Sequence, residues 1–326
     1  MKNILKALAT AMLSFCMAAA APAFAQQTHT HPTFPTQPVR LVVPFPPGGS
    51  TDALARLIGE KLAARWKQTV MVENRPGANT MLGTDAVAKS PPDGHVLGIV
   101  TGSHVINPLL ATSKMPYDTQ KDLTGVMLLT SFQMALWAHP SLPADDPAEL
   151  LALAKNEKVD YAAATTQSYL AMELFNTMAG TRMGYVPYKG SAQAVNDLMG
   201  GHVKLLMDPV SQALLEHVKN GKLKLIGTLG KRPSALAPGA PTFATAVPGY
   251  DFFGAFGLVA PAGTPPDVVR FIRDEFATVM KLPEVAERIT TIGQEAILST
   301  PEEYNQYLRA EGAKWAPIVK ATGATL

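Results

Sequence analysis

Short β-branched, apolar segments alternate along this chain with amphipathic segments, and this alternation constrains the fold more than any other feature. The run from Val39 to Phe45 has the composition of a buried strand, and in residues 52–66 the apolar side chains recur at three- and four-residue spacing. Strands that alternate with helices form parallel sheets covered by helices on both faces. The sequence therefore predicts an α/β fold.

The alternation continues over most of the chain. Further strands are predicted at residues 69–73, 96–101, 125–138, 159–164, 184–188, 203–207, 223–229 and 251–260, and further helices near residues 80–89, 147–156, 168–179, 191–199, 210–220, 265–281, 283–291 and 301–320. Residues 231–249 are rich in Pro, Gly and Ala without periodicity, which predicts a long loop. Ser50 or Thr51 is expected to cap the first helix, and Asp146 the helix at 147–156.

The first 25 residues have the pattern of a secretory signal peptide. Lys2 and Lys6 precede an apolar run that ends in Ala-Phe-Ala before Gln26. We expect export and cleavage after Ala25. Cys16 lies inside this run behind the large Phe15, which argues against a lipoprotein signal. No later apolar stretch reaches the length that a membrane helix requires.

Removal of the signal peptide leaves a neutral chain. The mature protein has 301 residues, and 26 of the 28 basic residues remain against 26 acidic ones. A neutral chain without basic runs is not adapted to nucleic acid or to an anionic membrane. It also has no cysteine, which excludes disulfides. Its length suits two domains of about 150 residues each.

The usual catalytic and metal-binding signatures are absent from the sequence. It contains no G-x-S-x-G, no P-loop, no H-E-x-x-H and no G-x-G-x-x-G, and its seven histidines lack metal-ligand spacing. The sequence therefore argues against an enzyme and predicts neither a metal nor a cofactor. An exported hydrolase that uses Ser103 with His104, or Ser191, stays an alternative, because triads assemble from distant residues.

Four turns rich in Gly, Ser and Thr follow predicted strands, at residues 45–51, 101–104, 165–169 and 188–192. Each places free backbone N–H groups and hydroxyls at a helix start or strand end, where an anion is favoured. Ligands of open α/β sheets bind beyond the carboxyl ends of the strands. The turns are therefore candidate parts of a site for a small anion. The alternative is that they are ordinary turns, since turns need Gly and Ser.

Two aspartates lie at such strand and helix ends. The carboxylate of Asp52 disfavours an anion at its turn, and Asp52 is expected to stabilise the start of its own helix. Asp208 follows the strand at 203–207 and precedes Pro209. It either caps the next helix or faces the cleft and contacts a polar group of the ligand.

Several motifs resemble one known family. The segments Pro44–Asp52, Val72–Ala78 and Pro92–Gly94 look like the opening of the Bug-type proteins, the periplasmic substrate-binding components of tripartite tricarboxylate transporters. The resemblance continues through 186–191, 260–265 and 301–303, so it covers essentially the whole mature chain.

This resemblance implies a two-lobed periplasmic binding protein of type II, in which each lobe is a sheet flanked by helices and the ligand cleft lies between the lobes. Lobe 1 is expected to hold residues 26–130 and 251–326, and lobe 2 residues 131–250. The family implies a monomer without cofactor that binds a small organic carboxylate (a di- or tricarboxylate or an aromatic acid) and passes it to inner-membrane permease subunits. A sensory receptor that feeds a signalling protein stays an alternative.

The family also implies the ligand-binding residues. By position, these are Phe45, Gly48, Gly49, Ser50, Thr51, Gly102 and Ser103 in lobe 1, and Thr165, Thr166, Ser168, Gly190, Ser191, Ala192 and Asp208 in lobe 2. The turn at 164–169 departs from the family, because it is shorter, lacks Gly and has Tyr169 where His is common. Gln167 and Tyr169 are therefore expected to add hydrogen bonds or to stack on an aromatic acid, so that the ligand differs from the commoner dicarboxylates.

Overall fold

A computed structural model describes residues 34–231 and 234–325, without the side chain of Ser50. The predicted signal peptide and its cleavage site lie outside the described residues. The strands are β1 (Val39–Val43), β2 (Val70–Asn74), β3 (Val96–Thr101), β4 (Leu123–Ala138), β5 (Asp160–Ala163), β6 (Gly184–Pro187), β7 (Leu205–Pro209), β8 (Lys224–Thr228), β9 (Phe253–Pro261) and β10 (Gln294–Ala296). The helices are α2 (Ser50–Trp66), α3 (Met81–Ala88), α4 (Ser103–Leu110), α5 (Pro147–Asn156), α6 (Thr166–Ala179), α7 (Ser191–Met199), α8 (Gln212–Lys219), α9 (Phe243–Ala246), α10 (Pro266–Met280), α11 (Pro283–Thr291) and α12 (Pro301–Thr322).

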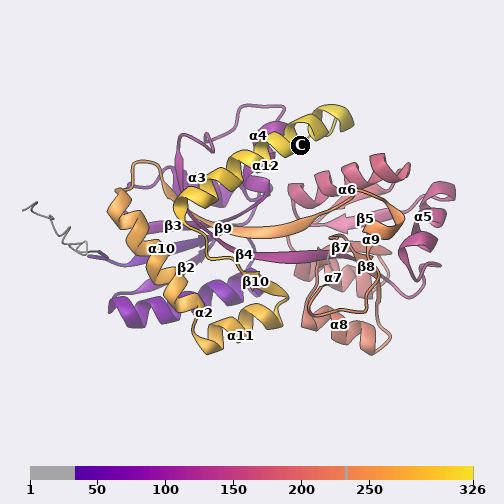
Figure 1. Cartoon of the computed structure of the whole chain (residues 1–326), viewed down its shortest axis with the longest axis horizontal. Coiled ribbons are helices and arrows are strands. Elements are labelled where there is room, and N and C mark those ends of the chain that lie inside the picture. The colour runs from indigo at the N-terminus through magenta and orange to yellow at the C-terminus, as the bar shows by residue number, and fades with distance from the viewer. Residues whose placement is uncertain (1–33, 232–233, 326) are drawn as a thin grey trace, which may run out of the picture. The chain divides into compact units, whose positions relative to one another are not determined.

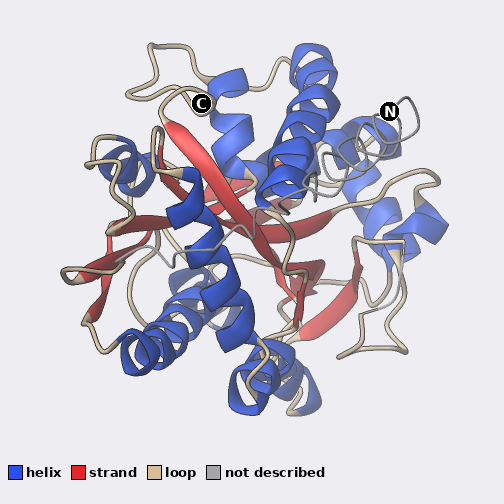
Figure 2. Cartoon of the chain, turned by 60° about the vertical axis from the view of Figure 1, so that its left-hand side comes forward, coloured by secondary structure: helices blue, strands red, loops and turns tan. Residues whose placement is uncertain are grey.

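All described strands join in one sheet, in the order β2-β1-β3-β9-β4-β7-β5-β6, with β8 and β10 also paired to β4. Helices cover both of its faces, as an α/β fold requires (Figure 2). The apolar runs of the sequence become its buried strands: Val39, Leu41 and Val43 of β1 are fully buried in the core. The predicted fold class is therefore confirmed.

The two long strands β4 and β9 connect the two halves of the sheet (Figure 1). Residues Leu123–Gln133 of β4 pair with β9, whereas residues Met134–Ala138 pair with β7 and β8. Strand β4 thus changes partners between Gln133 and Met134. We call the half with β1, β2, β3 and β10 the first half, and the half with β5 to β8 the second half.

The sheet is mixed, so the prediction of parallel sheets is wrong in part. Strands β1, β2 and β3 are parallel, as are β5, β6 and β7, but β9 runs antiparallel to both β3 and β4. The reason is that the chain passes between the two halves twice. It leaves the first half along β4 and returns to it along β9, beside β4. Two neighbouring strands that run in opposite directions pair antiparallel.

The structure corrects three local predictions. Gly49 occupies the N-cap of α2, and neither Ser50 nor Thr51 does, so the predicted cap is wrong. Helix α4, the single turn α9 and the short strand β10 were not predicted. Helix α4 contains Pro108 and is only eight residues long, which hides its period. The Asp146 cap is confirmed, since its side chain accepts a hydrogen bond from the Glu149 N–H.

No helix within residues 34–231 and 234–325 is long and apolar enough to cross a membrane.

Candidate binding pocket

A pocket of about 370 Å³ lies where the two halves of the sheet meet. It is lined by the segments that follow β1, β5 and β6, by the carboxyl ends of β3 and β7, and by residues of or next to the crossing strands β4 and β9. Its lining residues are Phe45, Pro46, Pro47, Gly49, Thr51, Thr101, Phe132, Met134, Ala164, Thr165, Gln167, Ser168, Lys189, Gly190, Ser191, Ala192, Gln193, Met207, Asp208, Pro209, Phe252, Gly254 and Phe256. The pocket therefore occupies the carboxyl ends of the strands, where α/β sheets bind ligands.

Two helices begin at glycines on the wall of this pocket. Gly49 is the N-cap of α2 and Gly190 is the N-cap of α7, and no described side chain caps either helix. The N–H groups of an uncapped first turn need an acceptor from water or a ligand. They also carry the positive end of the helix dipole. Both helix starts are therefore suited to an anionic group in the pocket.

Asp52 holds the turn before α2 in place. Its buried carboxylate accepts hydrogen bonds from the Gly48 N–H at 3.0 Å, from Asn74 Nδ2 at 2.9 Å and from Arg56 Nε at 3.1 Å. Gly48 has φ +91°, which only glycine adopts without strain. Burial alone would raise the pKa of Asp52, but these hydrogen bonds and the charge of Arg56 lower it. The predicted role of Asp52 in its own helix start is confirmed.

Asp208 faces the pocket and does not cap the next helix. Helix α8 is capped by Ser211, whose side chain accepts a hydrogen bond from the Leu214 N–H. Asp208 lines the pocket with an exposed fraction of 8%, and its Oδ1 accepts a hydrogen bond of 2.6 Å from Ser191 Oγ. Burial raises the pKa of Asp208 to about 7, while the bond from Ser191 lowers it. The capping alternative for Asp208 is therefore wrong.

Hydrogen bonds join the two halves beside the pocket. Ser103 Oγ accepts a hydrogen bond of 3.2 Å from the Gln167 N–H, and Thr166 Oγ1 donates one to Asn107 Oδ1. These four residues are buried, and they link α4 to the start of α6. The side chain of Gln167 also lies directly against Gly102. Helix α4, which the sequence does not predict, thus contributes the residues of the first half to this contact.

The pocket brings together nine of the fifteen predicted site residues: Phe45, Gly49, Thr51, Thr165, Ser168, Gly190, Ser191, Ala192 and Asp208. The other six do not line it. Gly48 precedes the α2 cap, and Ser50 is the first residue of α2, with its side chain outside the described part. Gly102, Ser103 and Thr166 lie in the contact between α4 and α6. Tyr169 stacks on Tyr185 with ring centroids 4.8 Å apart. Whether any of the fifteen binds a ligand stays a prediction.

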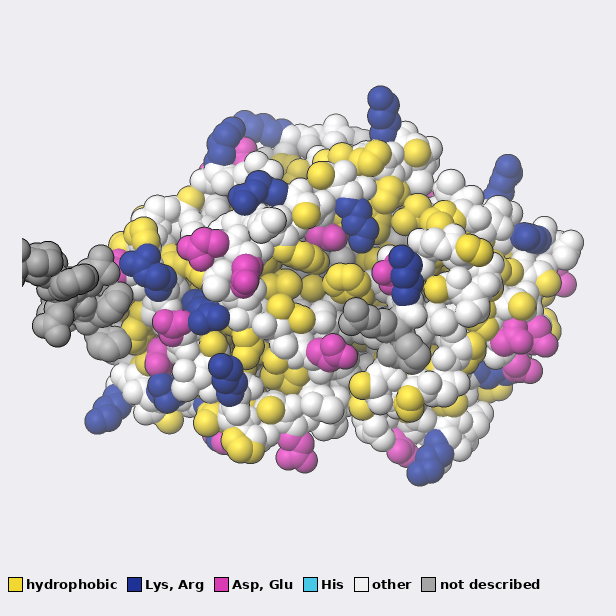
Figure 3. Space-filling model, viewed as in Figure 1, with side chains coloured by type: hydrophobic (Ala, Val, Ile, Leu, Met, Phe, Trp, Pro, Cys, Tyr) yellow, Lys and Arg dark blue, Asp and Glu magenta, His cyan; other side chains and the backbone are white. Residues whose placement is uncertain are grey.

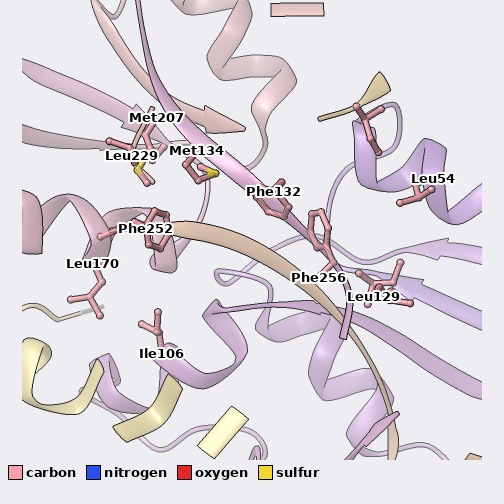
Figure 4. Packing of buried hydrophobic residues seen from close by; sticks show 14 of the residues in the cluster. Leu54, Ile106, Leu129, Phe132, Met134, Leu170, Met207, Leu229, Phe252 and Phe256 are labelled. Atoms are coloured by element: carbon pink, nitrogen blue, oxygen red, sulfur yellow. The ribbon is translucent and has the colours of Figure 1, made fainter. Parts of the chain in front are cut away.

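Sequence reasoning missed the apolar wall of the pocket. Phe132 and Met134 belong to β4, Phe256 belongs to β9, and Phe252 immediately precedes β9 (Figure 4). The rings of Phe132 and Phe256 are 4.9 Å apart, and Phe45 packs against Phe256 at 6.5 Å. In the sequence these residues look like ordinary core positions of buried strands. Only the partner change of β4 brings them to a cavity.

The alternative of a hydrolase finds no support in the geometry. Ser103 Oγ accepts a hydrogen bond from a backbone N–H, and Ser191 Oγ donates one to Asp208. Neither serine forms a hydrogen bond with a histidine among the described residues. His104 stacks parallel to Tyr117, and burial lowers its pKa to about 4. No group of His, Cys, Asp and Glu side chains in the described part is arranged to hold a metal ion.

Charge is scattered over the face of the molecule shown in Figure 3 instead of being concentrated. Basic and acidic side chains alternate over the visible face, with apolar side chains between them (Figure 3). Among the pocket residues only Lys189, which is exposed, and Asp208, which is buried, carry ionisable side chains. A bound anion therefore depends on local hydrogen bonds and helix starts.

Known proteins are similar to this chain in sequence and in fold. A family model described as "Tripartite tricarboxylate transporter family receptor" matches residues 54–324. Protein BugT of Bordetella pertussis (strain Tohama I) is 34% identical over 302 residues, which are 90% of this chain and 92% of that protein.

Two similar solved structures were determined with carboxylates. "R. palustris Rpa4515 with adipate" has a TM-score of 0.83 and 32% identity, over 90% of this chain and 100% of that one. MatC (Rpa3494) from Rhodopseudomonas palustris, with bound malate, has a TM-score of 0.80 and 28% identity, over 88% of this chain and 100% of that one.

Proposed function

Because the chain belongs to the family of tripartite tricarboxylate transporter receptors, we propose that it binds a small organic carboxylate in this pocket and delivers it to inner-membrane permease subunits. The family expected from the sequence motifs is confirmed, and so is the two-lobed α/β fold of periplasmic binding proteins. Relatives of the same fold hold adipate and malate, which supports a carboxylate as the class of ligand. The family consists of receptors, and we propose that this chain, too, has no catalytic activity.

One observation carries the proposal. The uncapped starts of α2 and α7 lie in different halves and open into the same pocket, at Gly49 and Gly190. A ligand that spans the two starts and presents a carboxylate to either of them accepts hydrogen bonds from N–H groups that otherwise need water, and its charge interacts favourably with the helix dipole there. Such a ligand also bridges the two halves, which favours their closed arrangement.

The exchange of partners along β4 supports a hinge there. We assign residues 26–130 and 251–326 to lobe 1 and residues 131–250 to lobe 2. The first boundary lies within three residues of Gln133, after which β4 changes partners. The second lies within three residues of Phe253, where β9 begins. Hinges absorb their movement in a few residues at element ends. The protein is proposed to act as a periplasmic monomer after cleavage behind Ala25. N-terminal sequencing of the exported protein should therefore begin at Gln26, and sedimentation should give one chain per particle.

Binding is tested by calorimetry and thermal unfolding with adipate, malate, citrate and benzoate at millimolar concentration. At least one acid should raise the unfolding midpoint, because a ligand at a hundredfold excess over Kd stabilises by about 2.7 kcal/mol. If neither these acids nor 4-hydroxybenzoate, terephthalate, 6-hydroxyhexanoate and hexanoate bind, the proposed carboxylate receptor is wrong.

A pair of variants locates the site. A Cβ on Gly190 would lie 3.3 Å from Cδ of Pro46, another residue that lines the pocket, so Gly190→Val should weaken binding more than tenfold while cooperative unfolding persists. Gly239 has open space around it outside the pocket, and Gly239→Val serves as the control. Equal affinity in both variants would place the ligand elsewhere.

Delivery is tested by uptake. Cells that lack the gene should lose uptake of the bound acid, and the wild-type gene should restore it. Unchanged uptake would contradict delivery to a permease and would favour the sensory alternative.

A further inference from the structure

The pocket has a polar end that a simple carboxylate does not match. Its two ionisable side chains differ in exposure: Lys189 is exposed to solvent, whereas Asp208 is buried, with an exposed fraction of 8%. No described cation forms an ion pair with Asp208, since its only side-chain bond in the described part comes from Ser191 Oγ. The buried end of the pocket is therefore acidic.

The second oxygen of Asp208 is free to accept a hydrogen bond. Ser191 Oγ donates to Oδ1, and Trp137 Nε1 donates to the main-chain carbonyl of Asp208 at 3.1 Å, which leaves Oδ2 without a donor among the described residues. A buried carboxylate oxygen favours a proton or a donor, because desolvation disfavours its charge. The raised pKa of Asp208 agrees with this. A ligand carboxylate at the same place would meet like charge.

Gln167 adds a second unpaired polar group. Its side chain is 4% exposed, lines the pocket and forms no side-chain hydrogen bond with a described residue. Its N–H group is held by Ser103 Oγ, which fixes the residue at the start of α6. A primary amide both donates and accepts, so it can bind a hydroxyl in either direction. The amide opens into the pocket without a partner among the described residues, and a ligand that pairs with it gains affinity.

The remaining wall is apolar and aromatic. Phe132, Met134, Met207, Phe252 and Phe256 are all buried and line the pocket. The cavity of about 370 Å³ exceeds what a four-carbon acid fills. This wall suits an aromatic ring or a six-carbon chain, which buries apolar surface against it.

We infer that the preferred ligand is a monocarboxylic acid with an apolar body whose opposite end carries a hydroxyl, which donates to Asp208 and contacts the Gln167 amide. This inference rests on the proposed function and narrows its substrate class. The carboxylate then lies away from Asp208, toward the start of α2. Dicarboxylates of the same length are disfavoured, because their second charge meets Asp208.

Two matched series of acids test the inference at pH 8, above the pKa of Asp208. The aromatic series is 4-hydroxybenzoate, benzoate and terephthalate, and the aliphatic series is 6-hydroxyhexanoate, hexanoate and adipate. In at least one series the hydroxy acid should bind about tenfold more tightly than the unsubstituted acid, and the dicarboxylate should bind more weakly than both. If the dicarboxylate binds as tightly as the hydroxy acid in every series that binds, the inference is wrong while the receptor function stands.

Two variants assign the effect to its residues. Asp208→Asn removes the charge at similar shape, so the penalty against the dicarboxylate should fall about tenfold or more. Gln167→Leu removes the amide, so the advantage of the hydroxy acid should shrink while binding of the unsubstituted acid stays close to wild type. Thr177→Val, on the exposed face of α6, is the control. Unchanged preferences in both pocket variants would overturn the assignment even if the hydroxy acid binds best.

Discussion

The side chain of Gln167 lies so close to Gly102 that a Cβ on residue 102 would be 2.1 Å from its Nε2 atom. The two residues come from opposite halves of the sheet, at the start of α6 and before α4. This contact places a buried amide at the wall of the pocket. The glycine is needed here for space and not for its backbone, since its φ is −57°.

Gly102→Ala should therefore weaken ligand binding with little effect on stability. The backbone accepts alanine, but the new methyl group displaces the flexible end of Gln167. The loss of one hydrogen bond to the ligand predicts an affinity about five- to tenfold lower by calorimetry. Gly239→Ala, in open space, should leave affinity unchanged. Wild-type affinity in Gly102→Ala would show that the position of this amide does not matter.

Thr166→Val tests the hydrogen bond between α6 and α4. The variant keeps the shape of Thr166 but removes the donor to Asn107 Oδ1, which lies in the other half. We expect affinity to fall about two- to tenfold, because a net hydrogen bond contributes about 0.5–1.5 kcal/mol. Thr177→Val removes a hydroxyl that bonds within α6, to the Glu173 carbonyl, and is the matched control. Equal effects of the two variants on affinity would argue against a role of this bond in closure.

Asp208→Asn should change how stability depends on pH. The folded-state pKa of Asp208 is about 7, above its ordinary value of 3.8. Between pH 3.8 and 7 the unfolded chain loses this proton while the folded protein keeps it, so the residue lowers stability progressively as pH rises. The slope is at most about 1.4 kcal/mol per pH unit. In urea unfolding without ligand, the wild type should lose stability relative to Asp208→Asn from pH 4 to 7, with no further change above. A constant difference would contradict the buried carboxylate.

Asp52→Ala should destabilise the protein by about 1–3 kcal/mol, because it leaves the Gly48 N–H and the Asn74 amide without their acceptor. The folded-state pKa of Asp52 is lowered, so its contribution is present above pH 3.8 and is lost as the pH falls through that lower pKa. Urea unfolding at pH 7 and pH 3 should therefore show a larger effect of the variant at pH 7. Asp274→Ala, which breaks an exposed pair with Arg273, should cost less than 1 kcal/mol at either pH. Similar losses for both variants at pH 7 would refute the special role of Asp52.

Several parts of the site could be predicted because they depend on neighbours in the chain. The turn before α2 is an example. Gly48 permits the positive φ, and Asp52, four residues later, accepts a hydrogen bond from the Gly48 N–H. The choice between two roles for Asp208 could not be made in this way. It depends on Ser191, which is 17 residues away in sequence and bonds its carboxylate, and on Ser211, which caps α8 instead.

Tyr169 and Gln167 show the same limit within one turn. From the sequence, both are expected to act on the ligand, because the turn departs from the family. In the helix they point differently: Tyr169 stacks on Tyr185, whereas Gln167 reaches the pocket and Gly102. The sequence indicated an unusual turn, and the packing around α6 decided which residue matters.

By itself, the sequence determined the α/β class, most strands and helices, the family and the turns from which the site is built. These properties follow from local periodicity, turn chemistry and motifs. Only the tertiary structure decided the mixed pairing of the sheet, the aromatic wall from β4 and β9, and the buried acidic end at Asp208. These features join segments such as Phe132 and Phe256 that are more than a hundred residues apart, and apolar strand residues look alike in sequence whether they fill a core or line a cavity. The difference arises where β4 exchanges partners and the two halves meet, because there these side chains line a pocket instead of packing on further strands.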